Sequence, residues 1–227
     1  RRCRGMLRVY RQRIGTFEYS DHCVAYGDGV MVPNYGERRN NGSLQTFSGN
    51  GDFLHSLNRN LDTPRAVALR DDGTAWVLLA DADEIVCVRL AVIHEEEDLG
   101  GEVLMRIGPL GTDYPLAESL VLAGDSLLVL CSFYEWGPGP ETTSNHVNVY
   151  DNQTGAFLRK FLLLPGKDDL GGNAEMMTVR GDMLYVTGRR NDTVDEYRWS
   201  DGTLMRSYGG ERHNSFHNPH SFHNPFG

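Results

Sequence analysis

The chain has 227 residues, a formal net charge of −9 at pH 7 and 40% hydrophobic residues. This composition is typical of a soluble globular protein, and the length can form one all-β domain. No apolar run approaches the ~18 residues that cross a bilayer, and the negative charge disfavours wide contact with phosphates, so the sequence predicts neither a membrane span nor a nucleic-acid partner.

The N-terminal residues 1–17 carry six arginines around Leu7–Tyr10. The pattern of Leu7–Tyr10 resembles Val147–Tyr150, which favours a strand with a solvated arginine face over a nucleic-acid arm. The first residue is Arg rather than Met, so we expect a fragment or a processed product. A missing signal peptide therefore says nothing about the compartment.

A turn built from Gly and Asp recurs four times along the chain, and an apolar run follows it each time. Glycine reaches positive φ at low cost and Asp hydrogen-bonds its own backbone, so each pair predicts a chain reversal into a strand. The four pairs are Gly27-Asp28 before Val30–Val32, Asp72-Gly73 before Ala75–Leu79, Gly124-Asp125 before Leu127–Leu130, and Gly181-Asp182 before Met183–Val186.

A second turn recurs later in each unit. It precedes Phe53–Leu57, Phe157–Phe161 and Leu204–Tyr208, and the acidic insertion His94–Gly101 takes its place before Val103–Ile107. The spacing of about 45 to 57 residues is typical of four-stranded propeller blades. The sequence therefore predicts an all-β fold, a β-propeller of four-stranded antiparallel blades.

The stretch Asn173–Gly209 contains all four strands of one such unit, separated by tight turns. The expected runs are Glu175–Val179, Met183–Thr187, Val194–Trp199 and Leu204–Tyr208. We interpret residues 1–227 as a single propeller domain with partial blades at 1–17 and 211–227 and full units at 18–60, 61–110, 111–165 and 166–210. The two ends could close a five-bladed ring, or blades could be missing from a six- or seven-bladed parent.

Two junctions resemble those of NHL-type propeller repeats. Thr63–Ala68 precedes Asp71–Gly73, and Asn218–Ser221 follows Tyr208–Gly210. In that family a blade ends near Phe-Gly or Tyr-Gly, and the next blade opens with Pro, a small residue and an apolar strand. The family's Val-Ala-Asp strand ending is present only as Leu79-Ala80-Asp81. The resemblance therefore implies the fold of the family rather than the activity of any member.

The connections from second to third strands open on one face of a propeller and carry aromatic and basic residues here. Long ordered loops are often functional, and Trp and Tyr beside Arg suit a binding surface. We predict a surface for a protein, a peptide or a small ligand, although Tyr134 and Trp136 could instead fold back onto a neighbouring blade. The predicted ligand-binding residues are Tyr35, Arg38, Arg39, Asp81, Tyr134, Trp136, Arg189 and Arg190.

Charged residues also recur seven positions before the Asp of each first turn. They are Asp21, Arg65, Glu118 and Glu175, and alignment of Pro219 on Pro64 adds His220. Equivalent positions on inner strands lie at one height around the propeller axis, so these side chains are expected to converge. Carboxylates and an imidazole could bind Ca²⁺ or Mg²⁺ through Asp21, Glu118, Glu175 and His220. Arg65 and water could instead neutralise the acids without a metal.

The sequence contains no nucleophile-and-base pairing and no nucleotide-binding loop, so it favours a non-catalytic binding platform. The alternative is a divalent-metal-dependent hydrolase, lactonase or lyase, whose ion would activate water or polarise the substrate. The four cysteines have no zinc spacing, and no disulfide framework is expected. Asn41, Asn152 and Asn191 begin possible glycosylation triplets, which are compatible with secretion but leave the compartment open.

Overall fold

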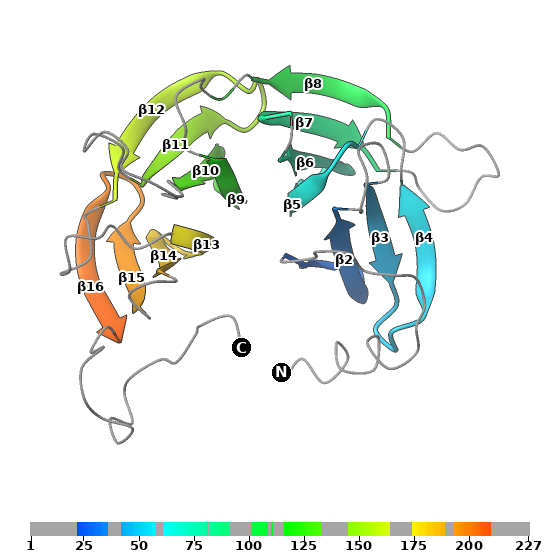
Figure 1. The fold of residues 1–227 in the computed structure, drawn as a ribbon, viewed down its shortest axis with the longest axis horizontal. Coiled ribbons are helices and arrows are strands. Elements are labelled where there is room, and N and C mark those ends of the chain that lie inside the picture. The colour runs from blue at the N-terminus through cyan, green and yellow to red at the C-terminus, as the bar shows by residue number, and fades with distance from the viewer. Residues whose placement is uncertain are drawn as a thin grey trace, which may run out of the picture. The chain divides into compact units, whose positions relative to one another are not determined.

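A computed structural model describes residues 22–35, 42–57, 61–80, 82–90, 101–108, 110, 116–132, 145–163, 174–188 and 193–209. These residues form four antiparallel sheets of four strands each, which confirms the predicted all-β fold class (Figure 1). In every sheet the strands pair in chain order. Within the described ranges no helix is long and apolar enough to cross a membrane.

The chain divides into two compact units, Arg1–Leu110 and Gly111–Gly227, and each unit contains two sheets, which we call blades. Blade 1 consists of β1 (Val24–Tyr26), β2 (Gly29–Asn34), β3 (Ser43–Phe47) and β4 (Phe53–Leu57). Blade 2 consists of β5 (Pro64–Leu69), β6 (Thr74–Leu79), β7 (Glu84–Arg89) and β8 (Val103–Ile107).

The second unit contains blades 3 and 4. Blade 3 consists of β9 (Leu116–Ala123), β10 (Ser126–Ser132), β11 (His146–Asp151) and β12 (Phe157–Leu162). Blade 4 consists of β13 (Ala174–Arg180), β14 (Met183–Gly188), β15 (Thr193–Arg198) and β16 (Thr203–Gly209). The four runs predicted between Asn173 and Gly209 are therefore the four strands of blade 4, with ends that differ by at most one residue.

Each unit has a core between its two blades. In the first unit Met31 and Leu44 of blade 1 pack with Val77 and Val86 of blade 2. In the second unit the core includes Leu128, Val147 and Phe161 of blade 3 and Leu184, Val186 and Tyr197 of blade 4. A single sheet would leave an apolar face in water, so pairing with a neighbouring blade is what makes each sheet stable.

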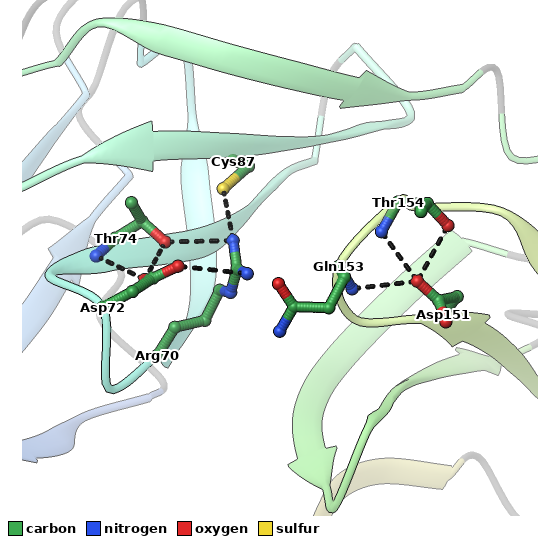
Figure 2. Close-up of polar contacts among 7 residues, drawn as sticks. All are labelled: Arg70, Asp72, Thr74, Cys87, Asp151, Gln153 and Thr154. Atoms are coloured by element: carbon green, nitrogen blue, oxygen red, sulfur yellow. Dashed lines mark hydrogen bonds and ion pairs between the residues drawn. The ribbon is translucent and has the colours of Figure 1, made fainter.

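The tight turns are fixed by aspartate side chains that accept hydrogen bonds from the residues just after them (Figure 2). Asp72 accepts from the backbone N–H of Thr74 at 3.1 Å and from its hydroxyl at 2.5 Å. Asp151 accepts from the N–H of Thr154 at 2.7 Å and from its hydroxyl at 2.8 Å. In each case the hydroxyl hydrogen bond is the main cause that lowers the pKa of the aspartate. In these two turns the aspartate is therefore an ionised cap that shapes the turn.

A β-bulge lies between the third and fourth strands of all four blades. The residue that it leaves without a cross-strand partner is a large apolar residue that is 37% to 55% exposed. These residues are Leu54, Leu104, Leu158 and Met205. A bulge interrupts the regular hydrogen-bonding edge of an outer strand, which discourages pairing of that edge with another chain.

Candidate functional site

The two ends of each blade are built differently. At the end that we call the tight-turn end, short turns join the first strand to the second in every blade and the third to the fourth in blades 1, 3 and 4, whereas residues 90–102 connect β7 to β8 in blade 2. At the opposite end, the loop end, the second strand is connected to the third through residues 35–42, 80–83, 133–145 and 189–192. The first strand of the next blade also begins at this end, because Pro64, the first residue of β5, pairs with Leu79, the last residue of β6.

Three of the predicted charged residues occupy one structural position at the loop end. Arg65, Glu118 and Glu175 are each the extra residue of a β-bulge, skipped by the register between the first and second strands of blades 2, 3 and 4. A bulge re-aims the side chain that it carries, and bulges are frequent beside binding and active sites. The shared sequence offset thus corresponds to a shared backbone feature. Asp21 and His220 lie outside the described residues.

In the second unit the strand segments that carry Glu118 and Glu175 lie side by side. The backbone N–H of Met177 on β13 donates to the hydroxyl of Ser119 on β9 at 3.4 Å. Glu118 is buried, with 5% of its surface exposed, and Glu175 is half-buried. Carboxylates in this arrangement could hold a hard cation. Among the residues that the structure describes, however, no cluster of three or more His, Cys, Asp or Glu side chains could bind a metal.

The loop end of blade 2 contains two non-glycine residues with left-handed backbone conformations. Thr63 and Asp83 both have a φ of 51°, which is rare, and rarest for a β-branched residue such as threonine. The carbonyl of Thr63 accepts from the N–H of Ala80 at 3.0 Å, and that of Asp83 accepts from the N–H of Leu110 at 3.1 Å. Such conformations cost about 1–3 kcal/mol each and are found preferentially at functional sites. Sequence reasoning missed both residues, because threonine rarely adopts positive φ and aspartate adopts it at only a few of the positions where it occurs.

The predicted loop surface falls largely in parts of the chain that the structure does not describe. Tyr35 is described and lies half-buried directly after β2, at the loop end of blade 1. The other predicted ligand-binding residues lie outside the described ranges, so the surface stays a prediction. They are Arg38, Arg39, Asp81, Tyr134, Trp136, Arg189 and Arg190.

A small pocket lies between blades 1 and 2, and sequence reasoning did not identify it. Its lining consists of four apolar side chains, Met31, Leu44, Leu57 and Leu90, and three with a polar atom, Tyr26, Thr46 and His55. The only signal in the sequence is a histidine on an outer strand, which by itself does not distinguish a surface residue from a pocket residue.

No protein-family model matches the chain, and no curated protein matches it. Among solved structures, glutaminyl cyclase of Myxococcus xanthus matches with a TM-score of 0.57 and 9% identity, over 84% of this chain and 70% of that chain. The WD40 repeats of RRP9 match with a TM-score of 0.55 and 12% identity, over 84% and 51%. Quinohemoprotein alcohol dehydrogenase of Comamonas testosteroni matches with a TM-score of 0.55 and 12% identity, over 85% and 35%.

The four sheets are propeller blades. The structural neighbours include enzymes as well as a WD40-repeat protein, and at 9% to 12% identity the likeness establishes the fold alone. The chain spans about a third of the dehydrogenase and about half of the RRP9 chain. The activity of a whole neighbour therefore does not carry over to this chain.

Proposed function

We propose that this chain is a non-catalytic binding platform that recognises an acidic protein or peptide through the loop ends of its blades. The observation that carries the proposal is the contrast between the two ends of each blade. The tight-turn ends are closed by local hydrogen bonds such as those to Asp72 and Asp151. The loop ends carry charged bulge residues, the strained Thr63 and, in blades 1 and 3, the longer connections 35–42 and 133–145. Binding residues are concentrated on loops that a rigid scaffold positions.

The chemistry of the loop ends suggests the class of partner. The predicted loop residues include four arginines together with Tyr35, Tyr134 and Trp136. Arginine forms paired hydrogen bonds with carboxylates, and Tyr, Trp and Arg are the residue types that dominate binding energy at protein interfaces. A net charge of −9 opposes an acidic partner at long range, so these arginines have to act at short range. An NHL-type relationship would be consistent with this role and is part of the proposal.

Selection from a random peptide library displayed on phage tests the platform. We expect the immobilised protein to enrich peptides with Asp and Glu. The W136A/R189A double variant should bind the selected peptides at least tenfold more weakly, because each residue supplies a typical interface anchor. The matched control is Arg180→Ala, which removes an exposed arginine at the tight-turn end of blade 4. Equal binding by the wild type and the double variant would refute the platform.

The second candidate is a divalent-metal-dependent hydrolase, lactonase or lyase. It is favoured by one observation, the equivalent bulge positions of Glu118 and Glu175 on neighbouring strands. In this proposal Asp21 and His220 complete the ligand set for Ca²⁺ or Mg²⁺, and the ion activates water or polarises the substrate. A ligand that binds only the native state raises the melting temperature. We therefore expect millimolar Ca²⁺ or Mg²⁺ to raise the Tm of the wild type but not that of the E118Q/E175Q variant, and equal Tm changes would refute this candidate.

A further inference from the structure

The sheet of blade 4 has one face toward blade 3 and a second face that points away from it, which we call the outer face. Leu184 and Tyr197 belong to the core with blade 3. Successive side chains of a strand point to opposite faces, so the residues next to these two point away from that core. Together with their cross-strand neighbours they form the outer face, which carries Tyr185, Val194, Glu196 and Tyr208.

The same positions in blade 3 pack against the following blade. Tyr185 is the fourth residue after Gly181, as Leu128 is after Gly124, and the cross-strand partners extend this correspondence to the third and fourth strands. The four equivalent residues of blade 3 are all apolar, are at most 8% exposed and belong to the core between blades 3 and 4. In the same order they are Leu128, Val147, Val149 and Phe161.

In blade 4 this face is polar at its centre and open at its edge. Glu196 is 9% exposed and accepts hydrogen bonds from the phenols of Tyr208, at 2.7 Å, and Tyr185, at 3.4 Å. Tyr208 is itself 39% exposed, whereas its equivalent Phe161 is 8% exposed. A segment that packs on this face therefore needs a polar group as well as an apolar one.

In both units the first strand of the following blade lies against the corresponding face. β5 contacts β1 and β2 of blade 1, and β13 contacts β9 and β10 of blade 3. Val67 and Leu69 of β5 lie in or against the core of the first unit, and Met177 and Val179 of β13 lie in or against that of the second. The partner that fits this face is therefore an extended segment that points two alternate side chains toward it.

The chain after β16 contains such a segment. Alignment of Pro219 on Pro64, the first residue of β5, defines the segment Pro219–Asn224. The residues at its two alternate positions are Phe222 and Asn224. Asparagine thus stands where β5 has Leu and β13 has Val, just as the outer face has a carboxylate and a phenol where blade 3 has Val and Leu. An asparagine amide can donate to a carboxylate and accept from a phenol.

The connection to this segment has a suitable length. Residues 58–63, 108–115 and 163–173 connect the fourth strand of blades 1, 2 and 3 to the first strand of the following blade. Between six and eleven residues are therefore enough for this crossing. The nine residues 210–218 between β16 and Pro219 lie within that range.

We infer that the outer face of blade 4 is a docking surface for the C-terminal part of the same chain, on which Pro219–Asn224 packs as β5 and β13 pack on their preceding blades. Phe222 supplies the apolar contact and Asn224 the polar one. His220 then occupies the bulge position that Glu175 has in blade 4. The inference depends neither on the proposed platform nor on a bound metal ion.

Disulfide trapping in the full chain tests this docking. The contact that serves as the template lies between blades 3 and 4, where the backbone N–H of Met177 donates to the hydroxyl of Ser119 at 3.4 Å. The equivalent residues are Phe222 and Met176, so cysteines at these two positions should come close enough to form a disulfide. The M176C/F222C variant is oxidised with glutathione disulfide, and peptide mass mapping without reductant measures the linked fraction.

Two matched variants set the scale of the linked fraction. S119C/M177C links two described strands and is the positive control. M183C/F222C is the negative control, because Met183 lies at the tight-turn end of the outer face, far along β14 from the partner of Met176. We expect a link within one molecule at least tenfold more often in M176C/F222C than in M183C/F222C. Every variant also carries C3S and C23S, so that the remaining native cysteines are the buried Cys87 and Cys131.

Two results of the trapping would overturn the inference. One is a linked fraction of M176C/F222C that is no higher than that of M183C/F222C while the positive control is linked. The other is a link that forms only between two molecules, which would mean that a second copy covers the outer face.

A second measurement needs no cysteine. Phe222→Ala should lower the Tm by about 5 °C or more, because it removes a packed ring. Phe216→Ala, in the connection 210–218, is the matched control and should leave the Tm unchanged. An unchanged Tm in Phe222→Ala counts against the docking, and this measurement decides the test where the cysteine variants lose their β-sheet circular dichroism or the positive control is not linked.

Discussion

Replacing Gly202 with alanine should weaken the packing between blades 3 and 4, and hence the folded state, through two separate effects. Gly202 has a φ of 75°, and an alanine there adopts a left-handed conformation at a cost of about 1–2 kcal/mol. The new Cβ would also lie 2.8 Å from Cβ, Cγ and Cδ2 of Phe161, and overpacking of this kind costs about 1–3 kcal/mol. We therefore expect the free energy of unfolding to fall by about 2–5 kcal/mol.

Gly124 provides the matched control for the backbone effect. It has a φ of 57° in the same unit, and a Cβ placed there meets no atom within 4 Å. Gly124→Ala should therefore lose only the ~1–2 kcal/mol of the backbone effect. Urea denaturation followed by circular dichroism measures both variants, and unchanged m-values would indicate that the unfolding transition is the same.

A double-mutant cycle isolates the steric effect. Phe161→Ala removes Cγ and Cδ2, two of the three atoms that the new Cβ of Gly202→Ala would contact, and keeps Cβ. In this background Gly202→Ala should cost less than it does in the wild type, with a coupling free energy of about 1 kcal/mol. Equal costs of the two glycine substitutions in the wild type, together with zero coupling in the cycle, would refute the packing argument.

Three further predictions concern titratable groups of blade 4. Burial raises the pKa of Asp195, so its charged form is costly in the folded state. The free energy of unfolding of the wild type therefore falls as the pH rises from about 4 through that raised pKa. Asp195→Asn should be more stable than the wild type at pH 7, and chemical denaturation at several pH values checks this. Hydrogen bonding from the backbone N–H of Thr203 lowers the pKa of Asp201 from 3.8 to about 2. The stabilisation by its charged form is therefore present above about pH 4 and is lost as the pH falls through 2. In Asp201→Ala the free energy of unfolding should fall less steeply with decreasing pH in the same measurement. The hydrogen bond from Tyr208 to Glu196, at 2.7 Å, is the main cause that raises the pKa of the Tyr208 phenol. Glu196→Gln should therefore shift the ultraviolet titration of this phenol back toward pH 10. An unchanged titration would contradict this cause.

The fold was predictable because its signals are local in the sequence. The first turn of each blade is specified by a Gly-Asp or Asp-Gly pair, and in blade 2 the side chain of Asp72 accepts hydrogen bonds from Thr74, two positions later. A strand must then follow, because the apolar run after the turn cannot remain in water. The run Phe53–Leu57, predicted from this logic, is β4 with the same bounds. Gly-Asp turns at a regular spacing were enough to predict four blades.

The candidate sites were less predictable, because they depend on pairing between strands. The common offset of Arg65, Glu118 and Glu175 indicated equivalent positions, but the bulge that they occupy is visible only in the cross-strand register. The left-handed conformation of Thr63 has no signal in its residue type. The pocket at His55 depends on which side chains face each other across two blades that are distant in the sequence.

The position of His55 illustrates how a repeated backbone can support different surfaces. The equivalent residues, each opposite its third strand and directly after the residue of the outer bulge, are His55, Met105, Arg159 and Arg206. The backbone around them is similar, because the outer bulge recurs in every blade. Only the side chain differs. Between blades 3 and 4 Arg159 reaches the next blade, whereas between blades 1 and 2 His55 lines a pocket. A substitution at this position can therefore change the contact between two blades without altering their strands, and we expect His55→Arg to place a longer side chain at the pocket between blades 1 and 2.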